Sequence, residues 1–141
     1  MRTFVGIDPG RSKCGLILID LEKELVLDGI VAEAKSVMQL LHLWHEKFPF
    51  EAILLGNGTS SDYWYRAIKS LAPVILVEEQ GTTFRARERY WQLWPAQNWE
   101  RWIPRGLKLP PEDLDAVAAM LLVEDYFQIL LGWPGLPNFR N

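Results

Sequence analysis

Residues 4–20 decide the fold, and they read Phe4-Val5-Gly6-Ile7-Asp8-Pro9-Gly10-Arg11-Ser12-Lys13-Cys14-Gly15-Leu16-Ile17-Leu18-Ile19-Asp20. The first four are apolar and are followed by turn residues, which is typical of a short buried strand. Pro9-Gly10 joins a fixed φ to a permissive one and predicts a tight turn. Residues 15–19 predict a second strand. Asp8 then ends the first strand, either as a positioned carboxylate or only as the first residue of an Asp-Pro-Gly turn.

The composition bounds the class of protein. The chain has 141 residues, of which 49% are hydrophobic, as expected of a folded domain that can bury a core. We expect one domain over residues 1–134 and a loose tail over 135–141. The single cysteine, Cys14, excludes an internal disulfide and suits a reducing compartment. No apolar run is long enough to span a membrane, and Met1-Arg2-Thr3 leads straight into the first strand, so we expect a cytoplasmic protein without a signal peptide.

The charge is unevenly distributed. The net charge is −3, but the segment from Arg85 to Lys108 carries six basic residues and two acidic ones. Such a segment is either an electrostatic footprint for phosphates or a solvated helix face. Residues 94–111 contain four prolines and three tryptophans and predict a long irregular loop. Tryptophans among arginines can stack on bases or simply hold the loop in place.

The order of elements predicts an α/β fold, a mixed five-stranded sheet with helices on both faces. The expected strands are residues 4–7, 15–19, 25–32, 51–56 and 73–79, and the expected helices are 35–48, 60–71, 82–93 and 112–131. The first, fourth and fifth strands should be the parallel ones, with the fifth buried. We expect helix caps from Thr59, Ser60 or Ser61, from Thr82 or Thr83, and a final stop at Gly132 and Pro134.

Three acidic positions lie where an open α/β sheet places its sites, at the carboxyl ends of parallel strands. They are Asp8, Glu79 (or Glu78) and Asp115, and the last has the small residues Ala118 and Ala119 on its helix face. Carboxylates that meet repel each other, and hard divalent ions relieve that repulsion and catalyse phosphoryl transfer. The alternative is that Asp115 only stabilises a helix N-terminus and that the glutamates form a solvated strand end.

Two other patterns carry less information. His42 and His45 lie three residues apart on a helix, a spacing at which two histidines could share a metal ion. The preferred interpretation is a surface or half-buried pair beside an apolar stripe. Gly56-Asn57-Gly58 leads from a strand into a helix, and such a turn can bind an anion or merely connect the two elements.

Four motifs in order resemble the YqgF family (RuvX type), Holliday-junction-resolvase-like proteins related to RuvC and implicated in maturing ribosomal RNA precursors. The motifs are Gly6-Ile7-Asp8-Pro9-Gly10-Arg11-x-Lys13-x-Gly15, Leu55-Gly56-Asn57-Gly58-Thr59, Glu78-Glu79-Gln80-Gly81-Thr82-Thr83-x-x-Ala86-Arg87 and Asp115-x-x-Ala118-Ala119. The resemblance implies an RNase H-like fold and hydrolysis of phosphodiester bonds that depends on Mg²⁺ or Mn²⁺. The catalytic and metal-binding residues would be Asp8, Glu79 and Asp115. The chain departs from the family in having Glu78-Glu79-Gln80 for the usual Asp-Glu-Arg, and Gly56-Asn57-Gly58 for the usual Gly-x-Pro.

We therefore predict a metal-dependent nuclease acting on structured nucleic acid, either junction DNA or precursor ribosomal RNA, and a homodimer is one option for its assembly. The residues expected to contact nucleic acid are Arg11, Lys13, Asn57, Thr82, Arg87 and Arg105. One alternative is a module of the same fold that binds nucleic acid without cutting it. Another is an ATP-handling domain of the actin and sugar-kinase type, which a chain of this length disfavours because those folds enclose the nucleotide between two domains.

Overall fold

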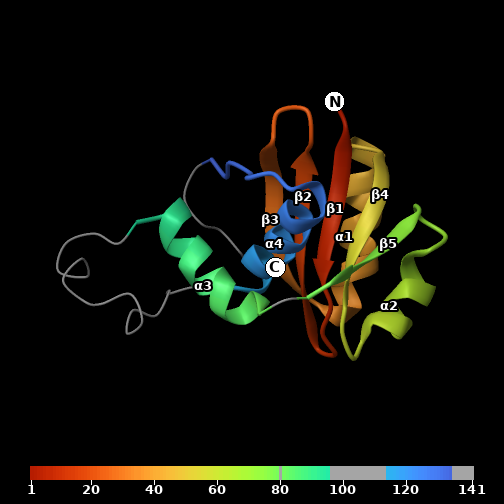
Figure 1. Ribbon diagram of the computed structural model, residues 1–141. Coiled ribbons are helices and arrows are strands. Elements are labelled where there is room, and N and C mark those ends of the chain that lie inside the picture. Colours follow the sequence, from red (N-terminus) through yellow and green to blue (C-terminus); the bar gives the residue numbers. More distant parts are fainter. Residues whose placement is uncertain (80, 96–113, 135–141) are drawn as a thin grey trace.

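Five strands and four helices make up the part of the chain that the computed structural model describes, residues 1–79, 81–95 and 114–134 (Figure 1). The strands are β1 (Thr3–Asp8), β2 (Lys13–Asp20), β3 (Leu25–Glu33), β4 (Phe50–Asn57) and β5 (Val74–Glu78). The helices are α1 (Ala34–Lys47), α2 (Ser61–Ile68), α3 (Thr82–Leu93) and α4 (Asp115–Phe127). None of these helices is long and apolar enough to cross a membrane.

The strands form one mixed sheet in the order β3-β2-β1-β4-β5. Short turns join β1 to β2 and β2 to β3, so these pairs are antiparallel. Helices α1 and α2 provide the crossovers that parallel strands need, and β4 therefore runs parallel to both β1 and β5. The predicted parallel set is confirmed. The carboxyl ends of β1, β4 and β5 consequently lie along one edge of the sheet.

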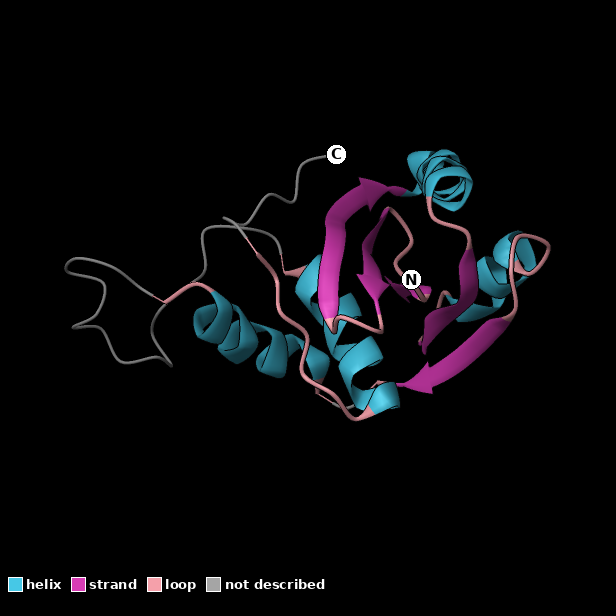
Figure 2. Cartoon of the chain, turned by 90° about the horizontal axis from the view of Figure 1, so that it is seen from above, coloured by secondary structure: helices cyan, strands magenta, loops and turns pink. Residues whose placement is uncertain are grey.

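Helices cover both faces of the sheet, as predicted (Figures 1 and 2). On one face, α1 and α2 bury Val37, Leu41, Trp44 and Trp64 against the strands. On the other face lies α4, in which every residue from Ala116 to Glu124 is buried. A helix is apolar all round only where it is covered all round. Here the sheet covers one side of α4, and α3 packs on another.

The last helix ends earlier than expected. Gln128 adopts the left-handed conformation, with φ of 56°, and terminates α4 four residues before Gly132. Gly132 instead pairs with Leu25 beside β3, because its carbonyl accepts from Val26 N–H at 2.7 Å and its own N–H donates to the Glu24 carbonyl at 2.9 Å. The expected first residues of this helix, 112–113, lie outside the described residues, as do most of the 94–111 loop and the 135–141 tail.

Three further expectations are wrong in detail. Ser60 stands at the N-cap of α2 without a side-chain cap bond, and the hydroxyl of Ser61, another expected cap, donates to the Gly58 carbonyl at 2.8 Å. The N-cap of α3 is Gly81, with φ of 60°, a backbone conformation that glycine adopts without strain. Strand β5 is an edge strand, and of its residues only Val77 is buried.

Candidate functional site

The turn after β1 is held from three sides. The indole Nε1–H of Trp64, on α2, donates to the Gly10 carbonyl at 3.0 Å. The Cys14 thiol lies 3.8 Å from the same oxygen. The N–H of Ala34, at the start of α1, donates to the Ser12 carbonyl at 2.8 Å. Asp8 therefore leaves the sheet from a rigid position at the end of β1. Its strand neighbour Ile7 packs on the α1 face, so the alternation along β1 directs Asp8 toward the α4 face.

Asp115 lies on the same face because of a glycine in β2. Gly15 pairs with Asp8 in the register of the hairpin, and a Cβ on Gly15 would overlap the backbone carbonyl of Asp115. The first turn of α4 thus rests directly on the strand that neighbours Asp8. Ala118 and Ala119 are buried in α4, and the close approach itself is permitted by the missing side chain of Gly15. Gly6 matters as well, since a Cβ there would come within 2.9 Å of the Ala119 carbonyl.

Glu79 follows β5, on the side of β1 opposite to β2, and its side chain lies near this face of the sheet. A Cβ on Gly56 would lie 2.7 Å from Glu79 Oε1 and 3.2 Å from the Cδ of Pro9, the residue after Asp8. Glu78 is directed elsewhere: it is exposed, and its Oε1 accepts a hydrogen bond from Asn57 Nδ2 at 3.2 Å. Of the two glutamates, Glu79 is therefore the one beside the β1 turn.

Asp8, Glu79 and Asp115 thus share one face and one edge of the sheet, linked through Gly15, Pro9 and Gly56. Carboxylate oxygens are the ligands that Mg²⁺ and Mn²⁺ prefer, so the donor set suits such an ion. Within the described residues, however, no three His, Cys, Asp or Glu side chains are gathered closely enough to hold one ion. A metal centre formed by these three acids therefore stays a prediction.

Charges around the site affect two neighbouring side chains. Burial, with smaller contributions from the negative charges of Asp8 and Asp115, raises the pKa of the Cys14 thiol to about 11. On the solvent side, Lys13 Nζ lies 3.9 Å from Asp115 Oδ2, with both side chains partly exposed. The chain thus places one cation of its own beside the acids.

The structure describes only some of the residues expected to contact nucleic acid. Arg11 is exposed in the turn between β1 and β2, and Lys13 is exposed at the start of β2. Asn57 is exposed at the end of β4, where it also accepts from the Ser61 hydroxyl at 3.3 Å. Arg87 is half-buried on α3. Thr82 begins α3, but its side chain, like the whole of Arg105, lies outside the described part of the structure.

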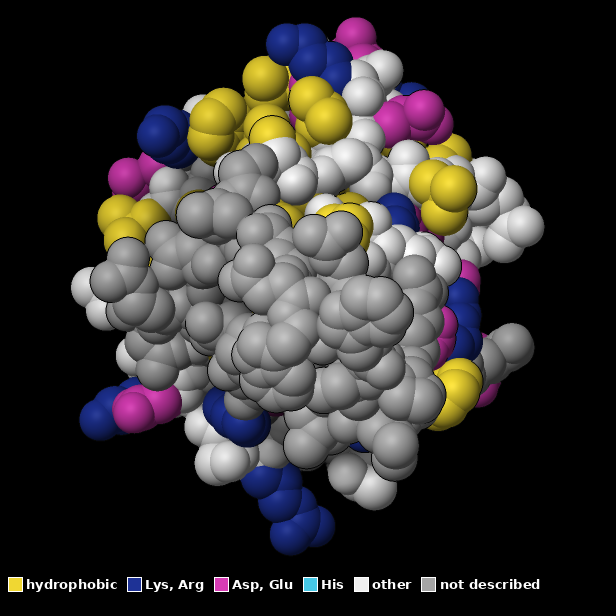
Figure 3. Space-filling model, turned by 90° about the vertical axis from the view of Figure 1, so that its left-hand side faces the viewer, with side chains coloured by type: hydrophobic (Ala, Val, Ile, Leu, Met, Phe, Trp, Pro, Cys, Tyr) yellow, Lys and Arg dark blue, Asp and Glu magenta, His cyan; other side chains and the backbone are white. Residues whose placement is uncertain are grey.

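Figure 3 views the molecule from the side of α3, where residues whose placement is uncertain cover the centre. The described Lys and Arg side chains visible there lie at the margin, several of them next to Asp or Glu side chains. The His42–His45 pair of α1 fits its preferred interpretation as a surface or half-buried pair. His45 Nδ1 accepts a hydrogen bond from the backbone N–H of Phe50 at 3.1 Å.

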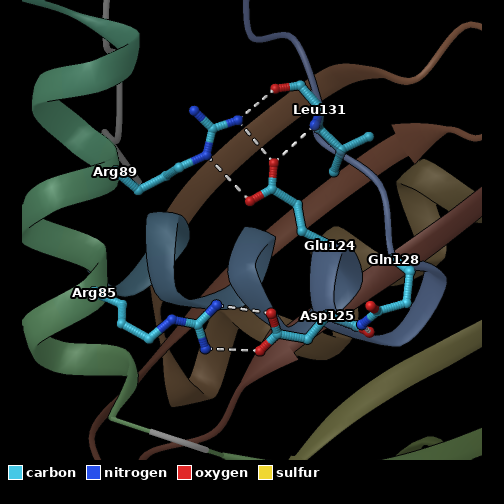
Figure 4. A network of polar contacts seen from close by, with 6 residues as sticks. All are labelled: Arg85, Arg89, Glu124, Asp125, Gln128 and Leu131. Carbon is cyan, nitrogen blue, oxygen red and sulfur yellow. Dashed lines mark hydrogen bonds and ion pairs between the residues drawn. The ribbon is translucent and has the colours of Figure 1, made fainter.

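Two arginines of the basic segment have a structural role (Figure 4). Arg85 makes a bidentate pair with Asp125, at 2.8 and 2.7 Å, and Arg89 makes one with Glu124, at 3.1 and 2.8 Å. They join α3 to α4. The guanidinium groups of these two residues are held by carboxylates of the neighbouring helix, and the choice between a phosphate footprint and a solvated helix face for the whole segment stays a prediction.

Comparison with known proteins identifies the fold. The Thermus thermophilus RuvC in complex with a Holliday junction substrate has a TM-score of 0.53 to this chain and is 21% identical, over 91% of this chain and 96% of that one. Another Thermus thermophilus RuvC structure has a TM-score of 0.51 at 20% identity, over 89% of this chain and 95% of that one. No family model and no curated protein matches the sequence. At this identity the likeness concerns the fold, and the chain has the RuvC-like RNase H fold that the sequence predicts.

Proposed function

We propose that this protein is a nuclease that depends on a divalent metal and hydrolyses phosphodiester bonds in structured nucleic acid, as a YqgF-type relative of RuvC. The observation that carries the proposal is that three chain segments with acidic residues approach the same edge and face of the sheet. The end of β1 brings Asp8, the residue after β5 brings Glu79, and the first turn of α4 brings Asp115. The likeness to RuvC, one of whose structures contains a Holliday junction substrate, supports it at the level of the fold.

In this proposal the three acids hold Mg²⁺ or Mn²⁺. When bound, such an ion supplies positive charge for the phosphodiester oxygens and lowers the pKa of a water that attacks phosphorus. The remaining roles belong to the chain. The turn at Pro9-Gly10, fixed by Trp64, keeps the Asp8 carboxylate in place, and the exposed Arg11 and Lys13 bind phosphates beside it. The substrate is junction DNA or precursor ribosomal RNA, as the YqgF resemblance implies.

One observation favours a second candidate, a module of the same fold that binds nucleic acid without cutting it. Lys13 Nζ already lies 3.9 Å from Asp115 Oδ2, so part of the acidic charge is compensated without a metal. The sequence also has Gln80 where the resembled family has an arginine. Both candidates need the fold and an exposed basic turn, and they differ in whether Asp115 is needed for chemistry.

A cleavage and binding assay on the same substrates decides between them. The parent protein, Asp115→Asn and the control Asp62→Asn are incubated with a four-way DNA junction and with precursor ribosomal RNA, in Mg²⁺ and in Mn²⁺. Asp62 is a matched control because it too is the acid in a helix first turn, on α2. The nuclease proposal predicts that Asp115→Asn lowers the cleavage rate by about 100-fold or more, with little change in affinity, while Asp62→Asn cleaves normally. A parent protein that binds both substrates but leaves them uncut would establish the binding module instead.

A further inference from the structure

Lys13 stands beside the acids because of its position in β2. It begins that strand, two residues before Gly15, and side chains two positions apart in a strand point to the same face of the sheet. That face is covered by α4, whose residues share a core cluster with Ile17, the next residue of the series. Because Asp115 rests on Gly15 there, the first turn of α4 brings its carboxylate to the lysine, and Lys13 Nζ lies 3.9 Å from Asp115 Oδ2.

The acid directly opposite Lys13 in the sheet already has a cation beside it. The register of β2 and β3 sets Lys13 against Glu33, and opposite charges at such positions usually attract each other. Glu33 Oε2, however, lies 3.3 Å from the Nζ of Lys35, near the start of α1. Because the charge of Glu33 is partly compensated in this way, Asp115 has the stronger attraction for the Lys13 ammonium group.

The contact between Lys13 and Asp115 is loose. Its 3.9 Å exceeds the roughly 2.8 Å of a charge-assisted hydrogen bond, and the two side chains are 50% and 34% exposed. The pair of Arg89 and Glu124 is by contrast made at 2.8 Å, between side chains that are 13% and 5% exposed. Water and salt screen an exposed pair, which contributes little to stability, so another charge can replace either partner at small cost.

The two ligands of the proposed nuclease would each replace one partner of this pair. A divalent ion at Asp115 repels the ammonium group that shares its carboxylate. A phosphate of nucleic acid attracts the same ammonium group, which is exposed at the start of β2, and draws it away from the carboxylate. Each ligand therefore removes a contact that opposes the other, and two sites linked in this way bind their ligands cooperatively and reciprocally.

We propose that Lys13 is an exchangeable counterion, which pairs with Asp115 in the free protein and with a phosphate in the complex, so that nucleic acid and the divalent ion strengthen each other's binding. This role rests on the proposed function, in which Asp115 holds the ion and Lys13 contacts phosphate. It adds regulation to that site, because the ion is held weakly until nucleic acid is present. Lys13 positions charge and takes no part in the chemical step.

The test measures metal binding as well as cleavage. Free Mn²⁺ is followed by electron paramagnetic resonance for the parent, Lys13→Met, Lys13→Arg and the control Lys23→Met, each alone and with a saturating four-way DNA junction or RNA hairpin. Phosphorothioate linkages slow hydrolysis and keep the charge of the backbone, and the Mn²⁺ that the nucleic acid binds by itself is subtracted. Lys23 is a matched control because it is exposed in the turn beyond the other end of β2.

The expected result separates the variants by the charge at position 13. Without nucleic acid, we expect Lys13→Met to bind Mn²⁺ about fivefold more tightly than the parent does, and Lys23→Met to bind it like the parent. Nucleic acid should tighten Mn²⁺ binding by the parent, Lys13→Arg and Lys23→Met about fivefold more than it tightens binding by Lys13→Met. Rescue by arginine would identify the positive charge as the cause.

Two outcomes would overturn the proposal. They are equal Mn²⁺ affinity of Lys13→Met and the parent without nucleic acid, or the same tightening in Lys13→Met as in the parent with both nucleic acids. If either is found while the parent cleaves its unmodified substrate, the nuclease proposal stands and only the exchange of Lys13 is lost. A parent that shows the coupling but cleaves nothing keeps the exchange and loses the nuclease. If the parent binds no Mn²⁺ in either condition, the metal site and the role of Lys13 are both lost.

Discussion

At the residue scale, the approach of α4 to the sheet depends on glycines, because a Cβ at their positions would overlap the helix. The Cβ that alanine would add at Gly15 meets the backbone of Asp115 and Ala116, which cannot rotate away as a flexible side chain would. We expect Gly15→Ala to lower the free energy of unfolding by about 3 kcal/mol, measured by urea denaturation. Gly58→Ala is the control, because its Cβ would lie 3.7 Å from Glu79 Oε2, an ordinary contact. Equal stability of the two variants would show that α4 is not seated on Gly15.

Cys14 makes stability depend on pH in the alkaline range. Because burial raises its pKa from 9.0 in the unfolded chain to about 11, the folded protein keeps the thiol proton at pH values where the unfolded chain loses it. Stability from this group is complete below pH 9 and falls as the pH rises toward 11. We expect the parent to lose about 2 kcal/mol more than Cys14→Ala over this range, in denaturation curves recorded at each pH. Parallel pH profiles for the two proteins would contradict a strongly raised pKa.

At the element scale, α3 is attached to α4 by one buried ion pair and one partly exposed pair. The side chains of Arg89 and Glu124 are 13% and 5% exposed, whereas those of Arg85 and Asp125 are 40% and 32% exposed. Removing one partner of a buried pair leaves a charge without compensation. We expect Arg89→Leu to destabilise the protein by about 3 kcal/mol, and Arg85→Leu by about 1 kcal/mol or less, in thermal or urea unfolding.

The two variants also differ in the position of the segment after α4. Arg89 holds the Leu131 carbonyl as well as Glu124, so its loss should increase amide exchange of Leu131 and Gly132, which Arg85→Leu leaves protected. If both variants lose the same stability and the same amide protection, the buried pair does not contribute more than the partly exposed one.

The elements themselves were largely predictable, since they follow from local patterns. Pro9-Gly10 marks the first turn, Pro49 follows α1, and apolar spacing identifies the helices. The features that could not be predicted depend on contacts between elements that are distant in sequence. The end of α4 at Gln128 is not marked by a glycine or proline, and Gly132, which is marked, pairs with Leu25 instead. The pairs of Arg85 and Arg89 join two helices far apart in sequence, so charge counting along the chain did not reveal that these arginines are paired with α4.

At the scale of the whole molecule, the edge at which Asp8 and Glu79 lie could be predicted because the order of parallel strands fixes it. Asp8 ends β1, Glu79 follows β5, and both strands run parallel to β4 between them. The choice between Glu78 and Glu79 could not be made from sequence, because it depends on the contact of Glu79 with Gly56 in another strand. Gly15 and Gly56 were the sequence features that could have predicted these contacts, because a glycine inside a strand often marks a place where another part of the chain comes close to the strand.

The charge of this edge leads to a prediction about metal. Asp8, Glu79 and Asp115 bring three carboxylates to one face, against which Lys13 supplies one nearby ammonium group. A divalent ion that binds the folded state alone stabilises it by mass action, by about 2.7 kcal/mol at a hundred times its dissociation constant, which corresponds to roughly 9 °C for a domain of this size. We therefore expect the melting temperature to rise with millimolar Mn²⁺ or Mg²⁺.

Variants of the same edge test whether the ion binds where proposed. Asp8→Asn removes one ligand charge and should abolish the rise in melting temperature, while Asp62→Asn, in the first turn of α2, should keep it. Lys13→Met removes the cation that lies 3.9 Å from Asp115, so it should enlarge the rise at a given metal concentration. If Asp8→Asn keeps the full rise, the ion binds elsewhere on the protein. If the parent shows no rise, Lys13 already compensates the acids, and the fold then serves to bind nucleic acid rather than to cut it.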